Sequence, residues 1–306
     1  MAKSDNDILK RTLRHYIDLE YYANGVDEEI QELLEILLKE CDAIISSQDS
    51  YNTKSAYSLA YKAIKEKVDG FGKELEKKLE REAKLVRDEE SDFLAKLYGS
   101  ALTVGAISLS NILFAPIDGR DTTKQFVERT TKNILRSYDT SMRAGYLFGQ
   151  NSDDIKTQTA TRLKQISKGI HSGIRTAIPS YAKTTDNIIF LNNNAEVVYC
   201  AVLDGRTCIV CGNNHALHFK SIATAPLLPI HCGCRCCYIL ASAITEPMPT
   251  YEEYIESLSD EEQYHILGKN RYEMWKNYGI KLNQFVNNGM KLTLDELRKE
   301  YEDKLH

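Results

Sequence analysis

The stretch that decides the fold reads CAVLDGRTCIVC at residues 200–211 and resumes as HCGCRCC at residues 231–237. Seven of the eight cysteines in the chain lie in the 38-residue stretch from Cys200 to Cys237, where even scattering along the chain would place about one. Clustering of that degree needs a common cause. The N-terminus has no apolar signal-peptide core, so we expect the chain to be made and kept in a reducing cytoplasm, where clustered cysteines more often bind a metal than form disulfides.

The spacing of these cysteines is typical of a zinc site. Cys208-x-x-Cys211 places two thiols on one tight turn, and His231-x-x-Cys234 presents a second pair after 19 intervening residues. Two such pairs complete a tetrahedron of zinc ligands. Because the four donors are thiols and an imidazole, with no carboxylate and no open position, we predict a structural zinc site that stabilises the fold and activates no water.

Several neighbouring donors leave the choice of ligands open. Cys236 is the leading substitute for one of the four. Cys232 is a further competing thiol. His215 and His218 are expected to be ordinary surface histidines, and Cys200 and Cys237 small buried side chains on the flanking strands. Disulfide or redox chemistry, and packing of the cysteines alone, remain alternatives to zinc.

The sequence on either side of the cysteines changes its pattern. Residues 196–203 and 236–242 are β-branched and aromatic runs of strand length, which predicts a short β-hairpin module around the cluster. The first 175 residues show apolar side chains at helical spacing, including a long charged helix over 53–92 that Gly70 and Gly72 should bend or weaken. The predicted fold is therefore mainly α with a small zinc-stapled β unit (α+β).

The last 60 residues carry unusually clear helix starts. Thr250, Ser259 and Thr293 are each followed three residues later by Glu, which is the capping-box pattern. Short helices are expected near residues 251–258, 260–278 and 294–304. The predicted domains are a helical domain, a Cys/His zinc-binding module and a helical tail, over residues 1–175, 176–245 and 246–306.

The charge is unevenly distributed along the chain. The net charge of −5 over 306 residues is unremarkable, but residues 120–175 carry 11 Lys+Arg against 5 Asp+Glu. This pattern argues against a uniformly basic nucleic-acid binder and permits one local surface for an anionic partner. Four basic residues fall on one side of a predicted helix over 122–148, where they could contact DNA phosphates or an acidic protein partner, or form a solvated face. This basic stripe consists of Arg129, Lys132, Arg136 and Arg143.

A membrane segment is not expected. Residues 97–117 lack charges, but glycines, serines, an asparagine and a proline interrupt them. We interpret this segment as a buried or partner-facing helix.

The cysteine motif also resembles that of a known family. Asp204-x-Arg206-Thr207-Cys208-x-x-Cys211, followed by Pro229-x-His231-x-x-Cys234-Arg235-Cys236, is similar to the C-terminal signature of the minor head proteins of tailed bacteriophages, the Mu F-like head-morphogenesis family. The resemblance extends over roughly residues 170–300 and includes similar strings at 174–177, 267–271 and 292–297. It departs from the family where Cys232-Gly233 replaces the usual Pro-Asn, which adds a competing thiol.

This resemblance implies a specific role. The protein would be a minor capsid component that joins the phage portal and other head proteins in the host cytoplasm, and that stays in the virion head. It would act in head morphogenesis without catalytic residues and could hold or release packaged DNA through the basic stripe. The alternatives are a zinc-ribbon nucleic-acid binder, although residues 176–245 carry 4 Lys+Arg against 3 Asp+Glu, and an HNH-type nuclease, although the chain has no Asp-His dipeptide.

Overall fold

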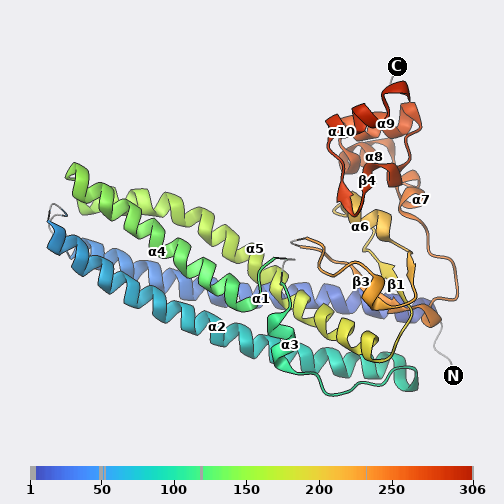
Figure 1. The fold of residues 1–306 in the computed structure, drawn as a ribbon, viewed down its shortest axis with the longest axis horizontal. Helices are drawn as coiled ribbons and strands as arrows, with labels where there is room; N and C mark the ends of the chain where they lie inside the picture. Colours follow the sequence, from blue (N-terminus) through green and yellow to red (C-terminus); the bar gives the residue numbers. More distant parts are fainter. Residues whose placement is uncertain (1–4, 48–50, 52, 118–119, 232, 305–306) are drawn as a thin grey trace. The chain divides into compact units, whose positions relative to one another are not determined.

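The chain folds into two compact units in the computed structural model (Figure 1), which describes residues 5–47, 51, 53–117, 120–231 and 233–304. We call them the bundle unit, Ile17–Asp186 with His231–Gly233, and the sheet-and-tail unit, Met1–Tyr16, Asn187–Ile230 and Cys234–His306. Helices dominate, and the strands are few, short and antiparallel, so the predicted α-rich fold with a small β unit is confirmed. The predicted domain boundaries at 175/176 and 245/246 stay predictions.

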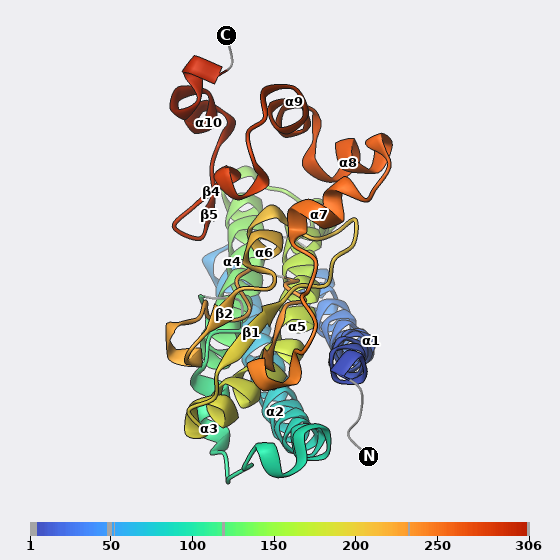
Figure 2. The ribbon, with the colours of Figure 1, turned by 90° about the vertical axis from the view of Figure 1, so that its right-hand side faces the viewer.

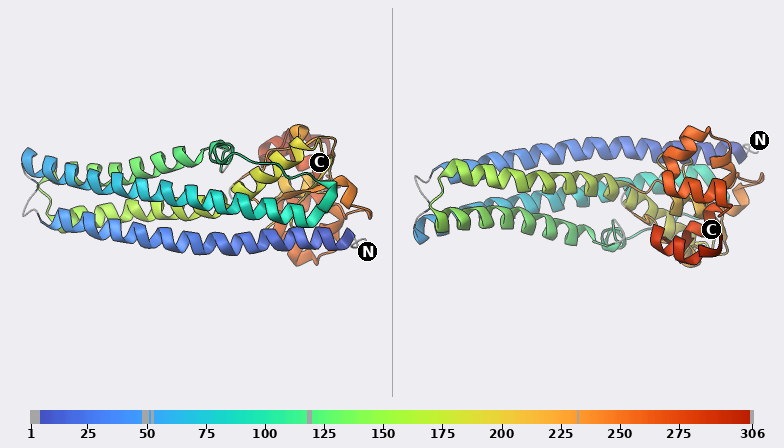
Figure 3. Two further views of the ribbon diagram at one scale, coloured as in Figure 1. Left: turned by 90° about the horizontal axis from the view of Figure 1, so that it is seen from below. Right: turned by 90° about the horizontal axis from the view of Figure 1, so that it is seen from above.

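Long helices that lie side by side form the bundle unit (Figure 3): α1 (Asp5–Ser46), α2 (Lys54–Tyr98), α4 (Thr123–Phe148) and α5 (Ser152–Asn192). The helical spacing of their apolar residues directs one face of each helix inward. The fully buried side chains include Ile30, Ile64, Leu75, Ile134 and Ile170. The bundle core is thus built from branched aliphatic residues contributed by all these helices.

Helix α2 continues through its two glycines, contrary to the bend or weakening expected there. Gly72 lies against α4: a Cβ added to it would come within 2.8 Å of Cγ2 of Thr131. The missing side chain therefore allows α2 and α4 to approach closely, and the packing offsets the low helix propensity of glycine.

The uncharged segment at 97–117 is mostly not helical, so the expectation of one helix there is wrong. After α2, a short 3₁₀ turn (Gly99–Ala101) and an extended stretch precede α3 (Leu109–Phe114). Gly99 adopts φ of +56°, a backbone conformation that ends a helix. Within the described ranges, every helix falls short of the combined length and apolarity that crossing a lipid bilayer requires.

A small antiparallel sheet with the strand order β2-β1-β3 begins the sheet-and-tail unit (Figure 2). Its strands are β1 (Val197–Cys200), β2 (His218–Phe219) and β3 (Cys237–Leu240). Strands β1 and β3 occupy the two runs predicted from sequence, and all their residues are buried. Tyr199 lies directly opposite Tyr238, and Cys200 lies opposite Cys237.

Helices of the tail start where the capping boxes predict, at α7 (Tyr251–Glu256), α8 (Asp260–Leu267) and α10 (Leu294–Glu300). The single helix expected over 260–278 is wrong. It divides into α8 and α9 (Lys269–Tyr278) at Gly268, whose φ of +72° interrupts the helix. A β-hairpin between β4 (Val286–Asn287) and β5 (Met290–Lys291) was not predicted.

The short helix at the first cysteine pair packs against the apolar core of the tail. Helix α6 (Ile209–Asn214) places Ile209 in one apolar cluster with Tyr251, Phe285 and other tail residues. Gly212 of α6 lies under the ring of Tyr251, since an added Cβ would come within 2.4 Å of that ring. The Cys208-x-x-Cys211 turn is thereby fixed against the tail.

Candidate metal centre

The Cys208-x-x-Cys211 turn forms the start of α6. The Sγ atom of Cys208 accepts a hydrogen bond from the backbone N–H of Cys211 at 3.4 Å, so this thiol caps the helix. Cys208 is partly exposed, whereas Cys211 is buried. An N–H donor aimed at sulfur favours the thiolate, which is the form of cysteine that binds metals.

The second set of thiols precedes β3. Cys234 and Cys236 are both buried, and the Sγ atom of Cys234 lies 4.0 Å from Sγ of Cys211. Two thiolates bound to one tetrahedral zinc at about 2.3 Å lie about 3.8 Å apart, whereas disulfide sulfurs are separated by only about 2.05 Å. The observed separation therefore fits two sulfurs that share an ion.

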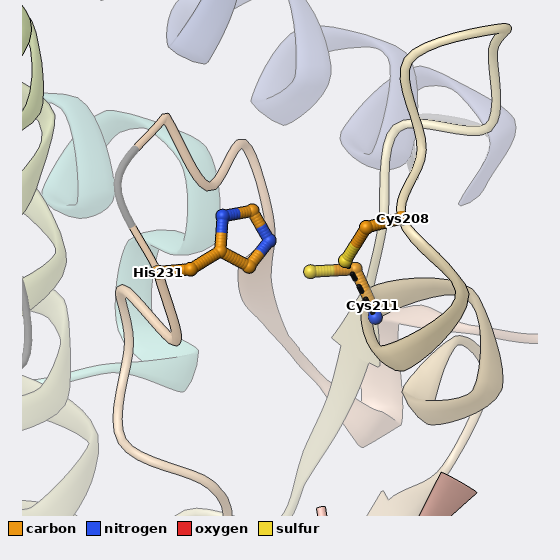
Figure 4. Close-up of side chains that lie close together, drawn as sticks. All are labelled: Cys208, Cys211 and His231. Carbon is orange, nitrogen blue, oxygen red and sulfur yellow. Dashed lines mark hydrogen bonds between the residues drawn. The ribbon is translucent and has the colours of Figure 1, made fainter. Parts of the chain in front are cut away.

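Two groups of donor atoms share Cys211. The ligand atoms of Cys211, Cys234 and Cys236 all lie within 4.8 Å of one another, as do those of Cys208, Cys211 and His231 (Figure 4). All four predicted ligands thus belong to one or the other group, together with the predicted substitute Cys236. This cysteine and histidine cluster can hold a metal ion.

The cysteines and the histidine of the cluster are assigned to different compact units. Cys208, Cys211, Cys234 and Cys236 are all part of the sheet-and-tail unit, whereas His231 is grouped with the bundle unit. The separations among the four cysteines therefore describe a site inside one compact unit.

Crowding of the thiols perturbs their protonation. Hydrogen bonding to Cys208, Cys234 and Cys236, followed by burial, raises the pKa of the Cys211 thiol. Neighbouring thiols resist ionisation together because their negative charges would repel each other in a buried setting. A bound cation removes that penalty, so metal binding should release protons and weaken in acid.

The remaining candidate donors lie outside these two groups. His215 is buried, so the surface position expected for it is wrong. Its Nδ1 atom accepts a hydrogen bond from the backbone N–H of Ala201 at 2.9 Å, and burial lowers its pKa to about 4. His218 is exposed on β2. Cys200 and Cys237 are buried opposite each other in the sheet, as expected for small apolar side chains, and Cys232 lies outside the described residues.

A salt bridge joins the two halves of the cysteine motif. The guanidinium of Arg235 donates to both carboxylate oxygens of Asp204, at 2.6 and 2.5 Å, and holds the pKa of that carboxyl below its usual value. The Thr207 hydroxyl accepts the backbone N–H of Asp204 at 2.9 Å and donates to the carbonyl of Val202. These contacts shape the loop before Cys208 and tie it to the segment before β3.

Sequence reasoning missed one residue beside the cluster, Tyr199 on β1. Its side chain is fully buried, and its hydroxyl lies beside the sulfur of Cys236 without a well-formed hydrogen bond to any residue that the structure describes. Burial, and then the nearby sulfurs of Cys236, Cys234 and Cys211, raise its pKa. From the sequence, Tyr199 is only an aromatic residue in the predicted strand before the cysteines. Its place beside the cluster could not be predicted, because the position of its hydroxyl depends on the pairing of β1 with β3.

Comparison with known proteins adds no identification. Neither protein-family models nor curated proteins nor solved structures give a match to this chain.

Proposed function

We propose that the cysteine and histidine cluster holds one zinc ion in a structural role. The donors in its two groups are thiols and one imidazole, without a carboxylate, and such soft sets favour zinc over calcium or magnesium. Burial of Cys211, Cys234 and Cys236 favours a closed site over one with a free position for substrate. The ion would connect α6 to β3.

A structural role fits the rest of the motif. Asp204, Thr207 and Arg235 make their contacts within the motif itself. The salt bridge between Asp204 and Arg235 is the main support for a structural role. Side chains that position a loop in this way stabilise the fold of the motif, and we propose that the protein is not an enzyme. From the resemblance of this motif we infer a minor head protein of a tailed bacteriophage, associated with the portal and located in the virion head.

Purified particles of the phage that encodes the chain test this role. Quantitative mass spectrometry should find the protein in heads at low copy number, and deletion of its gene should give defective heads. Absence of the protein from both heads and procapsids, with normal heads in the deletion, would contradict the assignment. Nicking of plasmid DNA by the purified protein with Mg²⁺ would instead support the nuclease alternative.

Metal analysis of the purified full-length protein tests the zinc. Inductively coupled plasma mass spectrometry should give one zinc per chain. Cys211→Ser should lose the metal, because Cys211 belongs to both donor groups. Cys200→Ser is the matched control: it is a buried cysteine of the same unit outside both groups, and it should keep its zinc. Metal-free wild-type protein with the same fold would refute the proposal.

Contact with packaged DNA would involve the basic stripe on α4. All four of its side chains are exposed, but Arg129 pairs with Asp121 at 2.5 Å and Arg143 pairs with Asp139 at 3.0 Å. These acidic partners reduce the positive potential, so we expect weak binding that falls steeply with salt.

A mobility-shift assay at low salt tests the stripe. The double variant Lys132→Glu/Arg136→Glu should lose DNA binding, because it reverses two exposed charges of the stripe. The matched control is Lys77→Glu/Lys84→Glu, which reverses two exposed lysines on α2 and should shift DNA like the wild type. Equal shifts by both double variants would remove DNA from the proposed function.

A further inference from the structure

The hydroxyl of Tyr199 is one of several buried polar groups in the described residues that the fold leaves unexplained. Its side chain has no solvent exposure, and its oxygen lies beside the sulfur of Cys236 without a well-formed hydrogen bond to any described residue. Buried hydroxyls are nearly always hydrogen-bonded in native proteins, because they lose their water on burial. The group therefore calls for an acceptor close to it.

The sheet directs this hydroxyl toward the cysteine cluster. Tyr199 lies opposite Tyr238 on β3, and side chains alternate between the two faces of a strand. Cys236, two residues before Tyr238, thus shares a face with both tyrosines. Tyr199 and Cys236 are close enough for each to affect the pKa of the other.

The hydroxyl of Tyr238, on the opposite strand, has a hydrogen-bond partner. The hydroxyl of Tyr238 donates to the backbone carbonyl of Pro226, and its ring meets the ring of Tyr199 edge to face at 5.5 Å between centroids. This packing holds the phenol of Tyr199 in place.

We propose that Tyr199 is a positioning residue of the metal centre, whose hydroxyl donates a hydrogen bond to the Sγ atom of Cys236 when that sulfur is a metal-bound thiolate. Cys236 is accordingly a ligand, in a set completed by Cys208, Cys211 and Cys234. This inference rests on the proposed zinc site. It adds which four cysteines bind the ion and which side chain stabilises one of the bound sulfurs.

The chemistry of sulfur explains why a bound metal would strengthen this contact. A neutral thiol is a weak acceptor, whereas a thiolate accepts a charge-assisted hydrogen bond that is about twice as strong as a neutral one. Four thiolates around one Zn²⁺ leave a net negative charge in a buried site, which donors around the sulfurs must offset. The backbone N–H of Cys211 serves Cys208 in this way, and the hydroxyl of Tyr199 would serve Cys236.

Cobalt-substituted full-length protein tests the hydrogen bond. Tyr199→Phe removes only the oxygen, so the protein should still bind one Co²⁺, with affinity lowered about 10- to 100-fold against a competing chelator. The sulfur-to-cobalt charge-transfer band should move to longer wavelength, because an unbonded thiolate donates its electrons more readily. Circular dichroism checks that the fold is kept.

Tyr238→Phe is the matched control. It removes a hydroxyl from the opposite residue of the same sheet, but one that bonds to a backbone carbonyl and not to sulfur. Its affinity for Co²⁺ and its charge-transfer band should match those of the wild type. If Tyr199→Phe behaves like Tyr238→Phe, the inference is wrong, whereas wild-type protein that binds no metal would refute the proposed zinc site itself.

Ligand variants test the assignment of Cys236. Cys236→Ser should weaken Co²⁺ binding and lower the intensity of the charge-transfer band per metal, since one thiolate is lost. His231→Ala should retain both. The reverse result, with metal lost in His231→Ala and kept in Cys236→Ser, would establish the set of three cysteines and His231 and overturn the inference.

Discussion

The bundle and the sheet are stabilised in different ways. The bundle core distributes its burial over long helices, with Ile64, Leu75 and Ile134 all fully buried. The sheet has strands of two to four residues, and strands that short have little stability of their own. Its thiols converge instead on one point. The bundle should therefore tolerate the loss of any single contact, whereas the sheet should depend on one ion.

Metal removal should have the largest effect and should separate the two regions. Structural zinc contributes about 10–16 kcal/mol in zinc-finger peptides, which is as much as the whole stability of a typical domain, about 5–15 kcal/mol. A strong chelator should abolish amide protection over residues 197–240 and leave it intact over residues 123–148. Hydrogen exchange read by mass spectrometry measures both regions in one sample. Unchanged protection of the sheet would contradict the comparison.

A cavity in the bundle should produce the opposite pattern. Leu75→Ala removes a fully buried side chain from α2 and should lower the free energy of unfolding by about 2–5 kcal/mol. Zinc content should stay at the wild-type value. Leu85→Ala, on the same helix at a side chain that is 44% exposed, is the control and should cost much less. Chemical denaturation gives both values, and loss of zinc in Leu75→Ala would show that the two regions are coupled.

The same contrast explains what the sequence could predict. Helices, capping boxes and the cysteine cluster follow from local spacing, and the structure contains them. The break at Gly268 was missed because a single glycine within helical spacing does not show whether its φ is positive. The Asp204–Arg235 contact joins residues that are 31 positions apart in the sequence. The position of the Tyr199 hydroxyl likewise depends on the pairing of Tyr199 with the distant Tyr238. Such contacts arise from strand pairing, which local patterns do not specify.

A smaller change tests whether the first cysteine pair depends on the tail for its position. Gly212→Ala places a methyl group against the ring of Tyr251, and overpacking of this kind costs about 1–3 kcal/mol. Unfolding of the sheet-and-tail unit should become easier, and zinc should dissociate faster. Gly205→Ala is the control, since a Cβ there meets nothing within 4 Å. Denaturation combined with zinc release to a colorimetric chelator measures both effects; wild-type behaviour of Gly212→Ala would argue against this dependence.

The last effect concerns a carboxyl group in the bundle and appears as a pH dependence. Burial raises the pKa of Glu90 to about 8, whereas a glutamate in the unfolded chain has a pKa of about 4.3. Between these two pH values the folded protein keeps this group protonated, while the unfolded chain has already lost the proton. Unfolding then releases a proton, and the contribution of Glu90 to stability falls as pH rises from about 4.3 to 8, by at most about 1.4 kcal/mol per pH unit. Above pH 8 it changes no further.

Glu90→Gln should remove this dependence, because the amide does not ionise. The free energy of unfolding of the variant should match that of the wild type below about pH 4 and exceed it increasingly toward pH 8, as measured by urea denaturation at fixed ionic strength. Glu74→Gln, at an exposed position of the same helix, should follow the wild-type curve. Parallel curves for Glu90→Gln and the wild type would mean that water or a rearranged neighbour stabilises the ionised carboxylate, and that this part of the bundle is less dry than its packing indicates.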